Sequence, residues 1–121
     1  MRCLIVDDNA YFRTAAGGLL TREGMVVGVA SSSAEALARA ERFHPDVILV
    51  DIELGEENGL DLAEQLPAAP GAAQSCVILC SAHAAQDFAD LTAESPAVAF
   101  LSKFDFSAAA IREILVTYRP V

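Results

Sequence analysis

The chain is almost without lysine: Lys103 is the only one, and every other side chain that is cationic at neutral pH is an arginine. The two residue types differ, because lysine carries a compact ammonium on a flexible stem whereas arginine carries a broad planar fork. A position that pairs one small cation with a small anion therefore favours lysine. Residue usage alone leaves two explanations for Lys103 open, a specific site or a chance surface lysine in an arginine-rich chain.

Positive charge is scarce as a whole, and the formal net charge is −9 over 121 residues. Nucleic-acid binding needs a basic surface, so we expect no nucleic-acid contact by this chain, and no anionic membrane surface as a partner. No apolar run approaches the roughly 20 residues that cross a bilayer. The N-terminal apolar run is short and ends in aspartates, unlike a secretory signal, so we expect a cytoplasmic protein.

Cysteine is also rare, and the three cysteines, Cys3, Cys76 and Cys80, all lie in apolar runs. An odd number in such places predicts small core residues rather than disulfides. A zinc site formed by Cys76, Cys80 and His83 is the weaker alternative.

What the chain does have is five short apolar runs separated by helix-like segments. The runs are continuous rather than alternating, which is typical of strands buried on both faces of a parallel sheet. The runs are 3–6, 25–30, 47–50, 76–80 and 98–101, and the helical segments are 9–23, 33–43, 59–66, 84–94 and 107–118. This alternation predicts an α/β fold of the flavodoxin-like (βα)5 type, with a doubly wound parallel sheet. We expect the strand order 2-1-3-4-5 and a single domain over residues 1–121.

Polar residues follow four of the five runs. Asp7 and Asp8 follow the first, Asp51 the third, Ser81 the fourth and Lys103 the last. The carboxyl ends of parallel strands meet at one edge of the sheet, where open α/β folds bind ligands. In the predicted order the first and third strands are neighbours, about 4.8 Å apart, so the three aspartates are expected to crowd together.

Such a cluster predicts a cation and a phosphoryl group. Carboxylates this close repel one another unless a cation or protons intervene, and Mg²⁺ suits an all-oxygen set of this kind. Ser81 would hydrogen-bond one phosphoryl oxygen, and Lys103 would pair with another, or with Asp51 when no phosphoryl group is bound. Each residue alone has an ordinary alternative as a helix cap, turn residue or surface lysine. Their joint placement favours a site.

With these residues in place, the chain closely resembles the receiver domain of two-component response regulators. The resemblance covers essentially the whole chain and rests on LIVDD (4–8), DVILVDIELGEENGLDL (46–62), VILCSA (77–82) and FLSK (100–103). It implies that Asp51 accepts a phosphoryl group from a sensor histidine kinase or phosphotransfer protein. It also implies that the chain catalyses only its own phosphorylation and dephosphorylation.

The resemblance assigns further roles. Asp8, Asp51 and the backbone carbonyl of Glu53 would bind Mg²⁺, and Asp7 would act through water. Ser81 and Lys103 would contact the phosphoryl group. The switch residues would be Ser81 and Phe100, and the residues expected to tune the lifetime of the phosphorylated state are Glu53, Ala82 and His83.

The chain departs from the usual family pattern at three positions. Phe104 replaces the proline that usually follows the lysine, and a cis bond without proline costs roughly 3 kcal/mol, so a trans peptide is favoured there. Gly55 stands where proline is common, and Phe100 lacks the hydroxyl of the more usual tyrosine. These changes affect the expected output surface and remove no catalytic group.

Output is expected through the face formed by the fourth helix, fifth strand and fifth helix, as docking or homodimerisation. Its apolar residues, of which we expect some to be exposed, are Phe88, Leu91, Ile111 and Leu115. Control of transcription would need a C-terminal DNA-binding domain, which this sequence does not include.

Two other functions are open. One is a Mg²⁺-dependent phosphohydrolase with an aspartyl-phosphate intermediate, although such enzymes usually carry a second aspartate where this chain has Glu53. The other is a phosphorylation-independent interaction module, against which the complete acid pocket argues.

Overall fold

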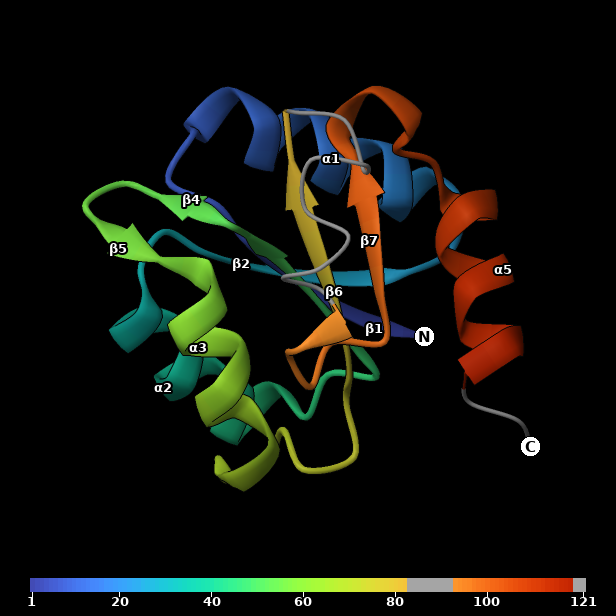
Figure 1. Ribbon diagram of the computed structural model, residues 1–121. Coiled ribbons are helices and arrows are strands. Elements are labelled where there is room, and N and C mark those ends of the chain that lie inside the picture. The colour runs from blue at the N-terminus through green and yellow to red at the C-terminus, as the bar shows by residue number, and fades with distance from the viewer. Residues whose placement is uncertain (83–92, 119–121) are drawn as a thin grey trace.

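The computed structural model describes residues 1–82 and 93–118, and its core is a sheet of five parallel strands (Figure 1). The strands are β1 (Arg2–Val6), β2 (Val26–Ala30), β3 (Val47–Asp51), β6 (Cys76–Ser81) and β7 (Ala99–Ser102). Their order across the sheet is β2-β1-β3-β6-β7. Because β6 and β7 are the fourth and fifth strands of this sheet along the chain, the predicted order 2-1-3-4-5 is confirmed.

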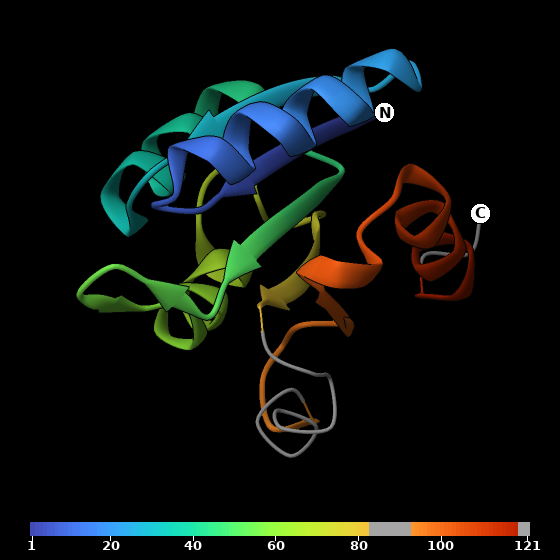
Figure 2. The same cartoon turned by 90° about the horizontal axis from the view of Figure 1, so that it is seen from above.

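Helices cover both faces of the sheet. The helices are α1 (Ala10–Arg22), α2 (Ser33–Phe43), α3 (Gly59–Gln65) and α5 (Ala108–Tyr118), with 3₁₀ turns η1 (Leu66–Ala68) and η3 (Lys103–Asp105). One buried cluster joins the sheet to α2 and α3, and the other joins it to α1 and α5. Figure 2 shows α3 and α5 at opposite sides of the molecule. The predicted helix over 84–94 falls mostly outside the described residues.

Strand alternation divides the sheet between these two clusters. In β1, Cys3 and Ile5 pack toward α1 and α5, whereas Leu4 and Val6 pack toward α2 and α3. Successive side chains of a strand point to opposite faces, so this division follows from the backbone. All of β3 and β6 is buried, as their continuous apolar runs predict.

Strand register sets the edge of the sheet that carries the polar residues. Asp51 of β3 pairs with Cys80 of β6, and Ser81 pairs with Ser102 of β7. Three neighbouring strands therefore end at nearly the same level. The β1 end is fixed by the backbone N–H of Asp7, which donates to the carbonyl of Ala30 at 3.0 Å.

A short antiparallel hairpin lies beside this edge and was not predicted from the sequence. It pairs β4 (Glu53–Leu54) with β5 (Glu57–Asn58) around a turn at Gly55, which has φ +61°. Each strand has only two residues, too few to produce a recognisable alternation. The backbone N–H of Ser33 donates to Glu57 Oε1 at 3.0 Å, which ties the hairpin to the start of α2.

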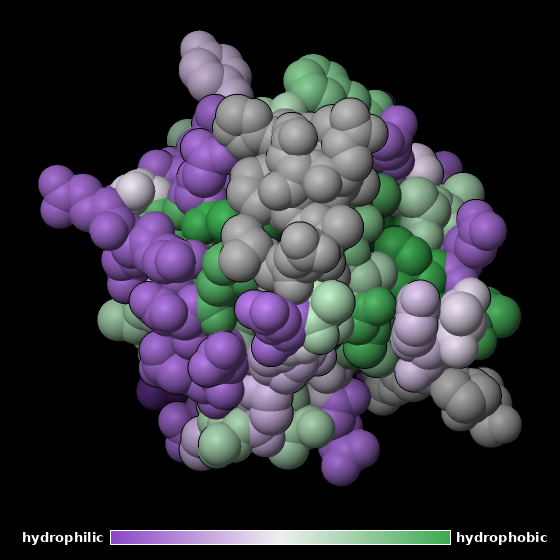
Figure 3. All heavy atoms as spheres, viewed as in Figure 1, coloured by the Kyte–Doolittle hydropathy of each residue, from purple (hydrophilic) through white to green (hydrophobic). Residues whose placement is uncertain are grey.

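The hairpin and α3 carry much of the negative charge. Hydrophilic side chains gather over this side of the molecule in Figure 3. The exposed acidic residues there are Glu53, Glu56, Glu57, Asp61 and Glu64. Within the described parts of the chain, no helix combines the length and apolarity needed to cross a membrane.

The expected apolar output face is corrected at α5. Ile111 and Leu115 were expected among its exposed candidates, but they are 0% and 5% exposed because they pack into the cluster shared with α1. The large apolar residues that α5 does expose are Val116 and Tyr118. The other two expected residues, Phe88 and Leu91, lie outside the described residues.

The two terminal helices are also joined by polar contacts. Arg112 of α5 donates from Nη2 to the backbone carbonyl of Glu23, the C-cap of α1, and pairs with its carboxylate at 3.7 Å. Cys3, Cys76 and Cys80 are buried and free, as the sequence predicts.

Gly59 provides a test of how tightly the start of α3 packs against the backbone of Asp51 at the end of β3. A Cβ at this position would overlap the backbone carbonyl of Asp51, whereas a Cβ at Gly18 of α1 would meet nothing within 4 Å. We expect Gly59→Ala to lower the free energy of unfolding by about 3 kcal/mol or more, because backbone must move to admit the methyl group. The control Gly18→Ala should raise it by about 1 kcal/mol through helix propensity. Urea unfolding would measure both, and equal effects would contradict the packing described.

Candidate functional site

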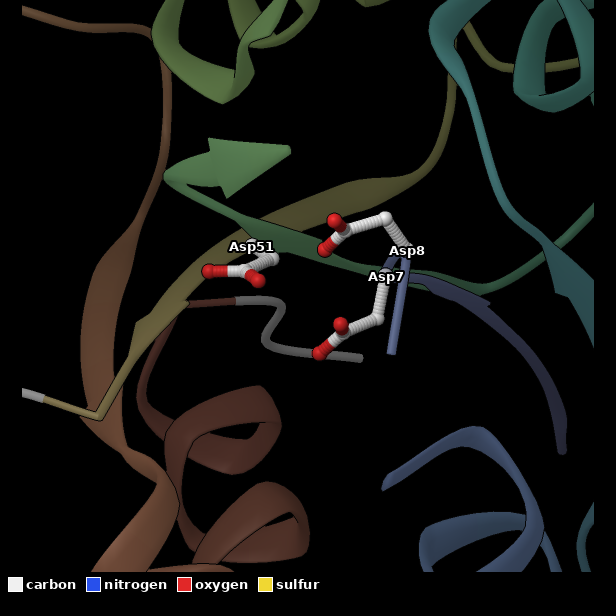
Figure 4. Close-up of side chains that lie close together, drawn as sticks. All are labelled: Asp7, Asp8 and Asp51. Atoms are coloured by element: carbon white, nitrogen blue, oxygen red, sulfur yellow. The ribbon is translucent and has the colours of Figure 1, made fainter. Parts of the chain in front are cut away.

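Three aspartates converge at the carboxyl ends of β1 and β3 (Figure 4). One carboxylate oxygen from each of Asp7, Asp8 and Asp51 lies within 4.8 Å of the others. Asp7 and Asp51 are buried, at 1% and 5% exposure, whereas Asp8 is exposed. The predicted crowding of the three aspartates is therefore confirmed.

Lys103 supplies the cation of this cluster. Its Nζ lies 2.6 Å from Asp7 Oδ2 and 3.2 Å from Asp51 Oδ2, and its side chain is only 16% exposed. The sequence predicted a pairing with Asp51, but Asp7 is the nearer partner. Asp7 Oδ2 accepts no well-directed hydrogen bond from the described residues, so the ion pair is what compensates its buried charge. Lys103 is thus a site residue and not a chance surface lysine.

The other oxygen of each buried carboxylate is held by the backbone. Asp7 Oδ1 accepts the N–H of Asn9 at 2.8 Å, and Asp51 Oδ1 accepts the N–H of Glu53 at 3.1 Å. Arg13 Nη1 also donates to the backbone carbonyl of Asp7 at 2.7 Å. These bonds fix the two carboxylates so that their Oδ2 atoms face the same ammonium.

Burial and charge shift the pKa values of two of these groups. Burial and the neighbouring Asp7 charge raise the pKa of Asp51 to about 6, although Lys103 and the backbone N–H of Glu53 act in the opposite direction. Burial lowers the pKa of Lys103, but the close contacts of its ammonium with the negatively charged Asp7 and Asp51 outweigh burial and raise this pKa above its usual value. Lys103 is therefore a permanent cation at neutral pH, and Asp51 is an unusually basic carboxylate.

An open pocket of about 310 Å³ leads to the cluster from solvent. It is lined by Asp8, Asn9, Asp51, Glu53, Gly55, Ala82 and Lys103. The expected site residues Ala82 and Glu53 thus reach the pocket. A Cβ on Gly55 would lie 3.4 Å from Asp8 Oδ2, and its φ of +61° disfavours any side chain, so the hairpin turn leaves Asp8 accessible.

Ser81 and Phe100 lie on the other side of the sheet end. Ser81 is fully buried, and its Oγ donates to Glu53 Oε1 across 3.4 Å, a long hydrogen bond. Phe100 is partly buried and packs against the cluster under α2 and α3. His83, the remaining expected site residue, lies outside the described residues.

The peptide after Lys103 has the trans conformation expected when Phe104 stands in place of proline. The Lys103–Phe104 peptide is trans, and Lys103 begins the 3₁₀ turn η3. Ser102 caps this turn by accepting the N–H of Phe104 at 3.3 Å. Phe104 is 82% exposed.

Sequence reasoning missed the aromatic side of the site. The ring of Phe12 lies under Lys103, with its centroid 4.5 Å from Nζ, and Phe106 packs edge-on against the same ring. The sequence pattern places Phe12 within the predicted helix over 9–23 and gives it no role at the site. Strand alternation could have indicated that α1 contacts the site. Odd-numbered residues of β1 and β3 face α1, and Asp7 and Asp51 continue that series.

Comparison with known proteins agrees with this geometry. The chain matches the family model described as "Response regulator receiver domain" over residues 3–115. The chemotaxis protein CheY of Thermotoga maritima is 34% identical over 86 residues, which cover 70% of each chain.

Two further proteins are similar to this chain, one over half of it and the other over nearly its whole length. The protein-glutamate methylesterase/protein-glutamine glutaminase of Archaeoglobus fulgidus is 44% identical over 61 residues, or 50% of this chain. The chain spans about a fifth of that relative's length, since the match covers 18% of it. The structure of the BeF3-activated N-terminal receiver domain of Klebsiella pneumoniae RstA aligns with a TM-score of 0.83 at 22% identity, covering 98% of this chain and 99% of that one. At this identity the likeness concerns the fold alone.

The raised pKa of Asp51 predicts a pH dependence of stability without metal. Because the folded-state pKa, about 6, exceeds the ordinary 3.8, the folded protein binds more protons than the unfolded chain between these values. The stability contributed by this carboxyl is complete below about pH 4 and is lost as pH rises through about 6. Relative to Asp51→Asn, the wild type should lose about 2 to 3 kcal/mol between pH 4 and pH 7.

Urea unfolding in EDTA across this range would measure the difference between the two proteins. Lys103 itself stays charged throughout, because its pKa is raised above its ordinary value, and its attraction for the ionised Asp51 is already included in the pKa of that carboxyl. Parallel pH profiles for the two proteins would show that Asp51 does not titrate as described.

Proposed function

We propose a function for this chain from one premise: it belongs to the response regulator receiver domain family of two-component signal transduction. The function is that of a phosphorylated switch, in which Asp51 accepts a phosphoryl group from a sensor histidine kinase or phosphotransfer protein. The observation that carries this proposal is the pair of buried carboxylates, Asp7 and Asp51, held on one ammonium at the open edge of the sheet.

Asp51 is suited to act as the nucleophile. A carboxylate oxygen of Asp51 attacks the donor phosphorus, a P–O bond forms, and the bond between phosphorus and the donor histidine nitrogen breaks. The leaving imidazole keeps the electron pair of that bond and is protonated. With a pKa of about 6, Asp51 is ionised at neutral pH yet more basic than an ordinary aspartate.

Lys103 is placed to receive the new charge. The phosphoryl group brings about −1.5 to −2 charges to the site and adds three acceptor oxygens. The ammonium that lies 3.2 Å from Asp51 Oδ2 can pair with one of these oxygens after a small side-chain movement. A guanidinium would be too broad for this position between two carboxylates, which explains the single lysine of the chain.

The same residues fit a bound Mg²⁺. All three side chains offer oxygen atoms, and the accessible Asp8 borders the pocket together with Asp51 and Glu53. Asp7 is already engaged by Lys103 and by the N–H of Asn9, which favours a contact through water. When bound, the ion would neutralise charge on the transferring phosphoryl group.

Ser81 and Phe100 are proposed as the route of the signal. The Ser81 hydroxyl would leave the carboxylate of Glu53 for a phosphoryl oxygen, since its present bond is long, at 3.4 Å. Phe100, two positions before Ser102 on the neighbouring strand, would move into the vacated space. Glu53, Ala82 and His83 are proposed to control access of water and so the lifetime of the aspartyl phosphate.

We place this switch in the cytoplasm, with docking or homodimerisation through the α5 face. On that helix Val116 and Tyr118 replace the buried Ile111 and Leu115 as candidate contacts. Family membership does not favour the phosphohydrolase alternative, and we propose that the chain catalyses only reactions of its own phosphoryl group. The methylesterase activity in one relative's name belongs to that longer protein and is not proposed here.

The assignment of Asp51 is tested by incubation with acetyl phosphate and Mg²⁺. The wild type should gain the mass of one phosphoryl group, and Asp51→Asn should gain none. The control Asp61→Asn, which removes an exposed aspartate of α3, should be modified like the wild type. Equal modification of Asp51→Asn would move the phosphoacceptor elsewhere.

Magnesium should stabilise the folded protein through Asp8. At free Mg²⁺ about 100 times Kd the gain is roughly 2.7 kcal/mol, or on the order of 10 °C in Tm for a domain of this size. Asp8→Asn should abolish most of this shift, whereas Glu64→Gln, which removes an exposed carboxylate of α3, should keep it. Thermal melts with EDTA or Mg²⁺ at matched ionic strength would decide, and an equal shift in all proteins would exclude Asp8 as a ligand.

A further inference from the structure

The Lys103 ammonium has three N–H donors, and besides the two carboxylates an aromatic ring lies against it. Asp7 and Asp51 approach at 2.6 Å and 3.2 Å, and the Phe12 ring lies 4.5 Å from Nζ. The side chain of Lys103 is 16% exposed, so this contact is largely removed from water. Cation–π attraction is strongest under such conditions.

The ring of Phe12 is itself fixed from two sides. The backbone N–H of Phe12 donates to Oδ1 of Asn9, the N-cap of α1, at 3.2 Å. Phe12 therefore lies in the first turn of α1, shortly after the aspartate pair. The Phe106 ring packs edge-on against it, with centroids 5.4 Å apart and an interplanar angle of 74°. The ring therefore forms a rigid surface under a flexible side chain.

A ring restrains the ammonium in a way that a carboxylate cannot. Lysine carries four methylene groups and loses about 2 kcal/mol of rotamer freedom when it is ordered. The electron-rich ring face attracts the ammonium but accepts no directed hydrogen bond of ordinary strength, so the N–H donors stay available for oxygen atoms. Its attraction also persists when the charge and position of the Asp51 side chain change.

We propose that Phe12 is a positioning residue for phosphoryl transfer, because its ring holds Lys103 Nζ at the point where a phosphoryl oxygen on Asp51 would meet it. This inference rests on the proposed function and adds to it a residue outside the acidic cluster. In the phosphorylated protein Lys103 exchanges one carboxylate contact for a phosphoryl contact, and the ring contact is retained through the exchange.

The experiment compares variants of Phe12 in the rate of phosphorylation by acetyl phosphate with saturating Mg²⁺. Phe12→Leu keeps an apolar side chain but removes the ring, and should slow the reaction roughly threefold to thirtyfold, the range expected for losing a cation–π contact. Phe12→Tyr keeps the ring and should remain close to the wild type.

Phe43→Leu is the matched control. Its ring lies under the Arg2 guanidinium at 4.2 Å, away from the pocket, so the change removes the same kind of contact elsewhere. The control should lose stability without losing phosphorylation rate. An equal slowing in Phe43→Leu would mean that Phe12→Leu acts through general destabilisation, and the proposal would fall.

A second series separates the electrostatics of the ring from its packing. Phenylalanine analogues of increasing ring fluorination at position 12 keep the shape but withdraw electrons from the ring face. The logarithm of the rate constant should fall stepwise along this series while Tm stays nearly constant. A rate independent of fluorination would overturn the proposal, because a purely structural role predicts that result.

A third measurement distinguishes failure of this inference from failure of the proposed function. The Lys103 ε-methylene protons should show an upfield ring-current shift in the unphosphorylated wild type that is lost in Phe12→Leu. If the shift is present but the wild type takes up no phosphoryl group, the proposed function fails, and with it a role for Phe12 in that transfer. If the wild type is phosphorylated and the shift is missing, the inference about Phe12 alone is wrong.

Discussion

The structure depends on one energetic constraint, the burial of Asp7 and Asp51 side by side. Removing two carboxylates from water costs several kcal/mol per ion, and their mutual repulsion adds to that cost. Lys103 offsets part of it through contacts at 2.6 Å and 3.2 Å, and the backbone N–H groups of Asn9 and Glu53 offset more. Two carboxylates and one ammonium still leave a net negative charge. The pocket therefore remains attractive to a further cation, and Asp51 retains a proton more readily than a surface aspartate does.

The surrounding fold is arranged to maintain that burial. The register of β1, β3 and β6 ends the strands at nearly the same level, so side chains from distant parts of the sequence meet there. Gly59 lets α3 lie directly against the backbone of Asp51. The cap at Asn9 starts α1 immediately after the aspartate pair and so sets the ring of Phe12, in the first turn, under the ammonium. Backbone geometry, rather than side-chain packing alone, thus determines where the charges lie.

The sequence predicted the sheet, its order and the acidic cluster because these depend on strong local signals. Continuous apolar runs identify buried strands, and the residue that follows each run is placed by the topology. The hairpin at Glu53–Asn58 was missed because two-residue strands have no periodicity of their own. The nearer partner of Lys103 and the burial of Ile111 depend on how side chains and helices pack in three dimensions. The spacing of residues along the sequence does not determine this packing. The role of Phe12 was missed because the sequence pattern does not distinguish an aromatic residue that packs in the core from one whose ring contacts a charged group.

The division of the core between two faces has a consequence for how the chain folds during synthesis. Among the described residues, every buried member of the cluster under α2 and α3 lies between Leu4 and Leu79, with the partly buried Ala97 and Phe100 packed against it, whereas the cluster under α1 and α5 requires residues up to Leu115. The link between Arg112 and Glu23 spans 89 positions of sequence, so it forms among the last contacts of an emerging chain. Most of one face can consequently assemble while the ribosome is still adding residues, whereas the opposite face, which α1 covers only in part, keeps apolar surface uncovered until α5 arrives. An interrupted chain that lacks α5 would expose this apolar surface and would be prone to aggregate.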